Sequence, residues 1–292
     1  MKKYSILLVI ALSTSKLFCV ENPSDSSQPR DKLNSTHEKY LKAYALLNGE
    51  GGEKDPFAAR KILEQCALEG NAKAKSALGC LMIQGTGGIS DVSKGIALLQ
   101  EAAECGAIEA QTNLGLIYEK GAIVEKNMEF AIKWYLKAAD SKSREALTRL
   151  VEIFYFGADD QIINHEKALP HVRTLAAMDN AWAQNILGTM LQHGQGVTVN
   201  LADSKYWYHE AALRNDAKAQ SNLGHMIRNR ATKDKEFAEA YQWLKLASDK
   251  NEPMALKTLN YLEMNLTPAQ KALGEQLISE FQTNLEASSP DK

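Results

Sequence analysis

Histidine and cysteine are the side chains that most often bind metals or act as nucleophiles, and neither is spaced for such chemistry in this chain of 292 residues. Zinc-binding histidines on one helix lie four residues apart, and zinc-binding cysteines come in closely spaced pairs. No histidine here has a second one four residues away, and none stands in zinc spacing with a cysteine. The six histidines are His37, His165, His171, His193, His209 and His225. The sequence therefore predicts no metal site and no cofactor.

The glycine-rich stretch Gly85-Thr-Gly-Gly resembles a phosphate-binding loop only superficially. Such a loop follows a strand and continues with a lysine and a serine or threonine, which contact the phosphates and the metal ion. Neither feature is present, and no serine lies in a nucleophile motif. The carboxylates fall on the surfaces of predicted helices, where they are solvated. We therefore predict that the protein is not an enzyme.

The elements that would position a functional side chain repeat along the sequence. An alanine that opens each predicted first helix marks the period, and the intervals between copies are 36, 36, 37, 36 and 36 residues. These alanines are Ala74, Ala110, Ala146, Ala183, Ala219 and Ala255. A Leu-Gly pair follows in most copies, and an Ala-Ala pair recurs in the second helix, where small side chains let another helix approach closely.

Two further series mark the ends of the second helices. The first is Asp55, Asp91, Asn127, Asn164, Asn200 and Glu236, and five of these six have side chains suited to capping the free amides of a helix start. The second series, fifteen residues later, is Gly70, Gly106, Lys142, Asp179, Asn215 and Asn251. Glycine and asparagine favour the left-handed conformation that ends many helices, so we assign this slot as the C-cap, with Lys142 as the exception by residue type.

These units predict an all-α fold, a right-handed superhelical solenoid of antiparallel helix pairs with about six repeats. Ser35 and Glu38 have the spacing of a capping box, which predicts that the first helix starts there. The predicted organisation is a flexible linker over 21–34, the repeat array over 35–265, a C-terminal capping helix over 266–286 and a flexible tail over 287–292.

The first twenty residues differ from the rest of the chain. Lys2 and Lys3 precede an apolar run over 6–12, and small and polar residues follow. This order is typical of a bacterial secretory signal peptide, and the apolar run is too short for a stable membrane span. We predict that residues 1–20 are a signal peptide and that the mature chain, without a membrane span, is periplasmic or secreted. The alternatives that remain open are lipid attachment at Cys19 and a cytosolic protein with an apolar start.

Cys66, Cys80 and Cys105 remain after removal of residues 1–20. An odd number leaves at least one cysteine unpaired within the chain. The first interpretation is that they are small buried residues in the seams between helices, since free cysteine packs as a small hydrophobic residue. The alternative is a Cys66–Cys105 disulfide, because equivalent helices of neighbouring repeats stack side by side.

The net charge is −2, and 24% of the residues are charged and 45% hydrophobic. These are ordinary values for a folded soluble protein. Such a balance gives no reason to expect a nucleic-acid partner.

The unit Ala110-Gln-x-x-Leu-Gly-x-x-Tyr, followed by Gly121, Asn127 and Trp134-Tyr-x-Lys-Ala-Ala, resembles the Sel-one-like repeat (SLR) family, relatives of the tetratricopeptide repeats. The resemblance covers about residues 38–265. It implies an adaptor-like solenoid, and many bacterial members of the family are exported and act in host interaction, envelope processes or signalling. Some cysteine-rich members are proposed to bind or hydrolyse β-lactams, and the paired cysteines of their repeats are absent here.

In solenoids of the tetratricopeptide type the first helices line the concave side. Residues six and three before the repeat glycine, and one and four after it, lie on one helical stripe. We predict that this stripe contacts a partner through Glu109, Thr112, Leu116, Glu119, Glu145, Glu152, Tyr155, Trp182, Asn185, Gln192, Lys218, His225 and Arg228. The charged side chains of the stripe are acidic in the repeats that begin at Ala110 and Ala146 and basic in the repeat that begins at Ala219.

Trp182 occupies a slot that Lys, Glu or Met fills in other repeats. Tryptophan is enriched at binding hot spots, so we interpret Trp182 as an anchor for a partner, with packing against the neighbouring helix as the alternative. The first hypothesis is an exported, non-enzymatic scaffold that holds a protein or peptide on its concave face. The alternatives are an envelope-associated hydrolase or β-lactam-interacting enzyme, and a purely structural envelope component. Partner identity and oligomeric state are left open.

Overall fold

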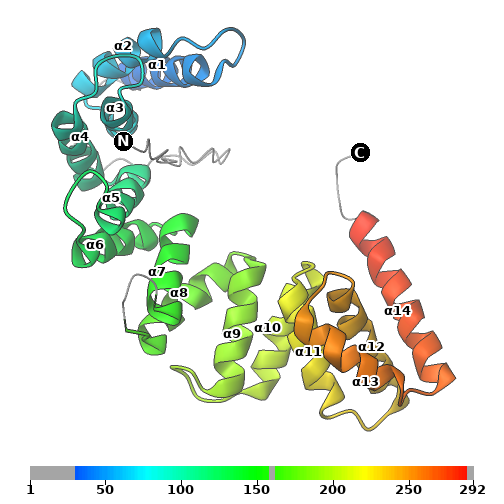
Figure 1. Ribbon diagram of the computed structural model, residues 1–292. Helices are drawn as coiled ribbons and strands as arrows, with labels where there is room; N and C mark the ends of the chain where they lie inside the picture. Colours follow the sequence, from blue (N-terminus) through cyan, green and yellow to red (C-terminus); the bar gives the residue numbers. More distant parts are fainter. Residues whose placement is uncertain (1–29, 158–161, 288–292) are drawn as a thin grey trace. The chain divides into compact units, whose positions relative to one another are not determined.

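The computed structural model describes residues 30–157 and 162–287, and the chain in these ranges is helical apart from its connecting turns (Figure 1). It divides into two compact units, residues 1–149 and residues 150–292, each with its own hydrophobic core. The division falls inside α7 (Arg144–Phe156). The predicted signal peptide with Cys19, the predicted linker as far as residue 29 and the predicted tail from residue 288 lie outside the described residues.

Unit 1 contains α1 (Arg30–Asn48), α2 (Pro56–Leu68), α3 (Ala72–Gln84), α4 (Val92–Glu104), α5 (Ile108–Lys120), α6 (Met128–Asp140) and the first half of α7. Unit 2 contains the rest of α7, α8 (His165–Ala177), α9 (Ala181–His193), α10 (Leu201–Leu213), α11 (Ala217–Arg228), α12 (Asp234–Ser248), α13 (Pro253–Glu263) and α14 (Pro268–Ala287). Helices pair in order, α3 with α4 or α9 with α10 (Figure 1). Within each unit one pair contacts the next, through α2 and α3 or α4 and α5 in unit 1 and through α8 and α9 or α10 and α11 in unit 2. The array is therefore the helical solenoid that the repeats predict.

Five of the six predicted N-caps begin the second helices. The side chains of Asp55, Asp91, Asn127, Asn164 and Asn200 each accept a hydrogen bond from a backbone amide of the first turn. The sixth assignment is wrong, because α12 begins after Lys233 and Glu236 lies within its first turn. The Glu236 carboxylate reaches back to the amides of Thr232 and Lys233, at 2.7 and 3.1 Å. These hydrogen bonds stabilise the ionised carboxylate and lower the pKa of Glu236.

The second predicted series is left-handed at every position, but its residues follow the C-caps and are not the C-caps themselves. The C-caps are Glu69, Cys105, Ser141, Met178, Arg214 and Asp249. The φ angles of the series are 90° and 85° at Gly70 and Gly106, and 59°, 60°, 67° and 63° at Lys142, Asp179, Asn215 and Asn251. Lys142 therefore adopts the conformation of the slot although its residue type does not favour it. The repeat geometry, and not the local residue preference, sets the backbone here.

The predicted starts of the first helices are late. The marker alanines lie in the third position of their helices and not the first, because the caps precede them. The side chains of Asn71, Asn180 and Asp216 accept hydrogen bonds at 2.8–2.9 Å from the amides of those alanines. Helix α1 also begins earlier than the predicted Ser35, at Arg30, since no proline or glycine within 30–34 stops it.

In α5–α6 and in α9–α10, the repeat glycine of the first helix faces a tyrosine of the second helix. A Cβ atom added to Gly115 would lie 2.4 Å from a ring carbon of Tyr135, and one added to Gly188 would lie 2.6 Å from the ring of Tyr208. Both tyrosine side chains are almost completely buried. The repeat glycine is therefore a packing residue, since its missing side chain leaves room for the ring.

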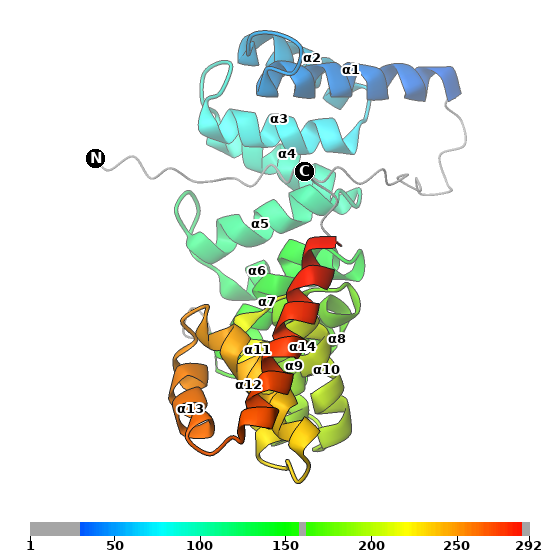
Figure 2. The ribbon, with the colours of Figure 1, turned by 90° about the vertical axis from the view of Figure 1, so that its right-hand side faces the viewer.

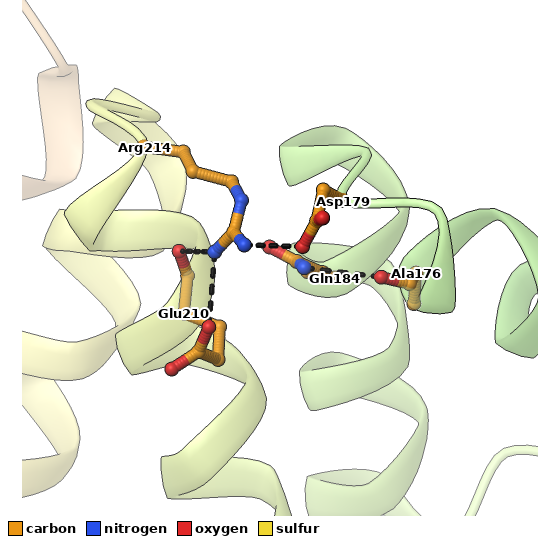
Figure 3. Close-up of polar contacts among 5 residues, drawn as sticks. All are labelled: Ala176, Asp179, Gln184, Glu210 and Arg214. Atoms are coloured by element: carbon orange, nitrogen blue, oxygen red, sulfur yellow. Dashed lines mark hydrogen bonds and ion pairs between the residues drawn. The ribbon is translucent and has the colours of Figure 1, made fainter.

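Neighbouring pairs are joined by a side-chain hydrogen bond that recurs with the repeat. Gln184 at the start of α9 donates through Nε2 to the carbonyl of Ala176 at the end of α8, at 3.0 Å (Figure 3). The equivalent bonds run from Gln111 to Ala103 at 3.0 Å and from Gln220 to Ala212 at 3.2 Å. The glutamine that follows the marker alanine thus links one repeat to the repeat before it.

Arg214 adds an ionic contact at the end of α10. Its guanidinium pairs with Asp179, which lies in the left-handed position after α8, and with Glu210 at 3.0 Å (Figure 3). Asp179 is largely exposed, so solvent screens this pair. The glutamine link therefore contributes more to holding the repeats together than the ion pair does.

The last helix closes unit 2 by packing along α12. Gln242 donates to the carbonyl of Leu277 at 3.0 Å, and the rings of Trp243 and Phe281 lie 5.4 Å apart. Helix α14 contacts α12, and α13 contacts α12 and α11 (Figure 2). The predicted capping helix is therefore present, and it covers α12.

The three cysteines among the described residues are free thiols. Cys66 and Cys80 are buried, Cys105 is exposed, and burial raises the pKa of Cys80 to about 12. The Cys66–Cys105 alternative is wrong for this structure, because Cys66 packs inside the core between α1 and α2 and contacts the carbonyl of Thr36 at 3.7 Å. The packing interpretation holds for Cys66 and Cys80, and Cys105 ends α4 at the surface.

Candidate protein-binding surface

The predicted contact stripe runs along the first helices, and the structure places its thirteen residues at different depths. Glu109 and Lys218 are exposed, and Leu116, Glu145, Glu152, Tyr155, Trp182, Gln192, His225 and Arg228 are partly exposed. Thr112, Glu119 and Asn185 are 4%, 2% and 8% exposed. The prediction that these last three project into an open groove is wrong, since neighbouring helices cover them.

Glu119 is part of a buried polar cluster in unit 1. Its carboxylate accepts hydrogen bonds from the Tyr135 hydroxyl at 2.6 Å and from Arg149 Nη2 at 2.5 Å, and Lys120 Nζ lies 2.8 Å away. Burial and the neighbouring carboxylate raise the pKa of Tyr135. Glu119, which the sequence analysis assigned to partner contact, is therefore bound by side chains of its own chain.

The equivalent position in unit 2 is held in the same way. The Tyr208 hydroxyl lies 2.9 Å from Gln192 Oε1 and 3.0 Å from Thr189 Oγ1. Asn185 Oδ1 accepts from Asn222 Nδ2 at 2.9 Å, on the next first helix. The tyrosine of the second helix is thus long enough to reach the contact stripe of the first helix. The periodicity of the first helix alone could not predict this contact.

An aromatic cluster lies at the surface of unit 2, where α7 ends and α9 begins. Trp182 stacks on Phe156 with ring centroids 6.1 Å apart, and Phe156 is 54% exposed. Tyr155 contacts Phe156 edge to face at 4.8 Å and donates a hydrogen bond from its hydroxyl to Gln195 Oε1 at 3.0 Å. Trp182 therefore packs against the neighbouring helix, as the alternative stated, and it also stays partly exposed beside an exposed phenylalanine.

The acidic members of the stripe differ in their surroundings. Glu109 of unit 1 is exposed, whereas Glu145 is partly buried and its pKa is raised by burial, with Arg149 opposing the shift. Glu152, in unit 2, is partly exposed. These side chains give the first helices negative charge near the middle of the sequence.

The basic members lie on α11 and contact α13. His225 Nε2 is 3.5 Å from Thr258 Oγ1, and the guanidinium of Arg228 lies 5.3 Å from the ring centroid of Tyr261. Burial and the charge of Arg228 lower the pKa of His225. Lys218 is exposed on the same helix. Unit 2 therefore has a basic surface on α11 that continues onto α13, the first helix of the following repeat.

Sequence reasoning missed the stripe of α13. Met254, Lys257, Tyr261 and Met264 stand at the same offsets from Asn260 as the α11 residues stand from their repeat glycine, Gly224, and all four are exposed. The signal was available in the spacing. It was overlooked because the Leu-Gly pair has decayed to Leu259-Asn260 in this repeat.

The described ranges hold no group of three His, Cys, Asp or Glu side chains placed to bind a metal ion. Within them, no helix has both the length and the apolar composition needed to cross a bilayer.

Two solved structures of repeat proteins are similar to this chain. One is a protective antigen present in uropathogenic Escherichia coli strains, which displays an SLR fold, with 27% sequence identity and a TM-score of 0.62 over 90% of this chain. The match spans 58% of that antigen. The other is a Sel1 repeat protein from Oxalobacter formigenes, with 25% identity and a TM-score of 0.56 over 76% of this chain and 91% of that protein.

A search of curated protein sequences gave no match. The Sel1 repeat model matches residues 40–71, 72–106, 108–143, 183–216 and 217–252, which together cover more than half of the sequence. Proteins with these repeats are generally non-enzymatic scaffolds for protein interaction. The repeat model, the helix pairs and the two similar structures agree, and the chain belongs to the Sel1 repeat family.

Proposed function

We propose that this protein is an exported, non-enzymatic scaffold that binds a protein or peptide partner on the contact stripe of its first helices. The observation that carries the proposal is the stacked pair Trp182 and Phe156, which keeps aromatic surface in contact with solvent. Tryptophan and its apolar neighbours at a surface are typical of binding hot spots, where a partner displaces water from the rings. The general role of the family supports the proposal.

The charges of the stripe support the same function. Glu109 and Glu145 lie on first helices of unit 1, and Lys218 and Arg228 lie on a first helix of unit 2. Opposite charge on a partner accelerates association and selects its orientation more than it adds affinity. A partner with complementary charge is therefore expected at each of these helices.

The binding role of the aromatic pair is tested by cross-linked pull-down from cell-envelope and host-cell extracts, followed by titration of each identified partner. Trp182→Ala and Phe156→Ala are each expected to weaken binding about thirtyfold, which corresponds to about 2 kcal/mol at a hot spot. Trp207→Ala is the matched control, because Trp207 is also partly exposed and packs beside an exposed aromatic residue, Tyr206, but lies on a second helix. A partner that binds the Trp182 variant as tightly as wild type rules out the anchor.

Export rests on the order of charged and apolar residues at the start of the sequence. When the full chain is made in bacterial cells, we expect the recovered protein to lack about twenty N-terminal residues by intact mass. Leu8→Arg interrupts the apolar run, so this variant is expected to keep its full mass and to remain in the cytosol. Recovery of the uncleaved wild-type chain from the cytosol would contradict export.

A further inference from the structure

Helix α13 presents an apolar stripe that the rest of unit 2 leaves uncovered. The helix packs on α12 and α11, while α14 lies along α12 (Figure 2). Met254, Tyr261 and Met264 are 60%, 59% and 82% exposed. Residues at these spacings lie on one side of a helix, so Met254, Tyr261 and the C-cap Met264 form an apolar strip that only Lys257 interrupts.

The charged side chains beside this strip are basic. Lys257 lies on α13 between Met254 and Tyr261, and Lys218 and Arg228 occupy the stripe of α11. No carboxylate stands at any of the eight stripe positions of these two helices. The Arg228 guanidinium lies 5.3 Å from the Tyr261 ring, so the basic and the apolar side chains form one surface.

The positive charge of the α11 stripe comes from Lys218 and Arg228, because the pKa of His225 between them is lowered by burial and by the charge of Arg228. The nearest carboxylate at the end of α13, Glu263, faces Lys271 of α14 at 3.8 Å. The positive charge of the stripe is therefore left for a partner.

We propose that the surface of Lys218, Arg228, Met254, Lys257, Tyr261 and Met264 binds an acidic peptide segment that carries apolar side chains. Its carboxylates pair with the three basic side chains, and its apolar side chains cover the two methionines and the tyrosine. Methionine adapts its shape to different apolar side chains, which suits a site for a flexible segment. This inference rests on the proposed scaffold function and defines the chemistry of one partner.

A second copy of the chain fits this surface less well. Two copies that met through the strip of α13 would bring basic side chains of one copy close to those of the other. Like charges placed opposite each other at an interface are unfavourable. Charge complementarity therefore favours an acidic partner over self-association.

The test is fluorescence anisotropy with the full chain and a labelled peptide that has glutamates on both sides of a Leu-Phe pair. One matched peptide has glutamine in place of every glutamate, and another has serine in place of leucine and phenylalanine. The first peptide is expected to bind, and each matched peptide to bind at least about tenfold more weakly. Equal binding of the acidic and the glutamine peptides, or no binding of the acidic peptide, would overturn the proposal.

The variants Lys257→Glu and Tyr261→Ala are each expected to weaken binding of the acidic peptide about tenfold. Lys205→Glu and Tyr206→Ala are the matched controls, because both residues are exposed on α10, a second helix, and Tyr206 is 56% exposed. The controls are expected to stay within about twofold of wild type. Loss of binding in the controls as well would show a non-specific charge effect and reject the site.

Two outcomes separate this inference from the proposed function. A pull-down partner that depends on Trp182 but is unaffected by Lys257→Glu and Tyr261→Ala, together with failed peptide binding, would leave the scaffold function intact and reject this site. Light scattering that shows a dimer lost in Tyr261→Ala would assign the strip to a second copy, and would also reject the proposal.

Discussion

Replacing Arg149 by methionine is expected to lower the free energy of unfolding by about 3 kcal/mol. The substitution keeps most of the side-chain volume but removes the charge that faces Glu119 at 2.5 Å. Glu119 is 2% exposed, so its carboxylate would stay buried with the Tyr135 hydroxyl and one lysine as partners. Stranding one member of a buried ion pair costs about 3–5 kcal/mol, and the lower end applies because the Arg149 side chain is 26% exposed.

Urea denaturation followed by circular dichroism measures this loss. Lys120→Met is the control, because Lys120 also lies 2.8 Å from Glu119 but its side chain is 58% exposed. An exposed ion pair contributes about 0–1 kcal/mol, so this variant is expected to stay close to wild type. Losses of less than about 1 kcal/mol for both substitutions would show that Glu119 is solvated, and would reinstate it as a candidate for partner contact.

Replacing Gly188 by valine is expected to lower the free energy of unfolding by about 3 kcal/mol. A Cβ atom at this position would lie 2.6 Å from the ring of Tyr208, which is 1% exposed and has no room to move. The ring or the helix must shift, and overpacking of a close-packed core costs about 1–3 kcal/mol. Valine adds two further methyl groups, which places the expected loss at the upper end.

A compensating change separates steric conflict from other effects of losing the glycine. Valine stands at the glycine slot in α7, at Val151, and by spacing Val172 of α8 takes the tyrosine slot; both are buried. The double variant Gly188→Val with Tyr208→Val should therefore cost about 2 kcal/mol less than the sum of the single variants. Additive losses in the same denaturation experiment would argue against a size-matched pair.

The caps and the pairing of helices could be predicted from the sequence because they depend on local residue types that recur with the period. Asn164 is an example, since an N-cap needs only its own side chain and the amides of the next turn. Glu236 shows the limit of this reasoning. A glutamate in register with caps reaches back from within the first turn, because its longer side chain suits that position.

The exposure of the stripe could be predicted only in part. Helical periodicity places Glu119 and Glu109 on the same side of α5, and it contains no information on what a second helix brings to that side. Tyr135 covers one of them and leaves the other exposed. The prediction considered each first helix by itself. The burial of a side chain on that helix also depends on the length of the side chains that the second helix packs against it.

The repeat that departs most from the pattern lies where the division of the chain falls. The Sel1 repeat model matches residues 108–143 and then 183–216, and α7 lies between these segments. Val151 replaces the repeat glycine and Leu147 replaces the linking glutamine of this helix. At the glycine slot, Val151 and the buried Val172 take the places of the glycine and the tyrosine of other repeats. At the glutamine slot nothing compensates, because leucine cannot donate the hydrogen bond that Gln111 and Gln184 donate to the preceding repeat.

The glutamine link also gives the array a direction, as monomers in a polymer chain have a head and a tail. Each linked repeat presents a donor at its beginning and an acceptor at its end, so a further repeat of the same kind could always be added after the last one. Helix α13 has Leu256 in place of the donor, and α14 lies along α12. The missing donor does not by itself end the pattern, because α7 lacks it as well and further repeats follow that helix. The departure found only at the end of the described residues is α14, which packs along α12 and not as the second helix of a pair with α13.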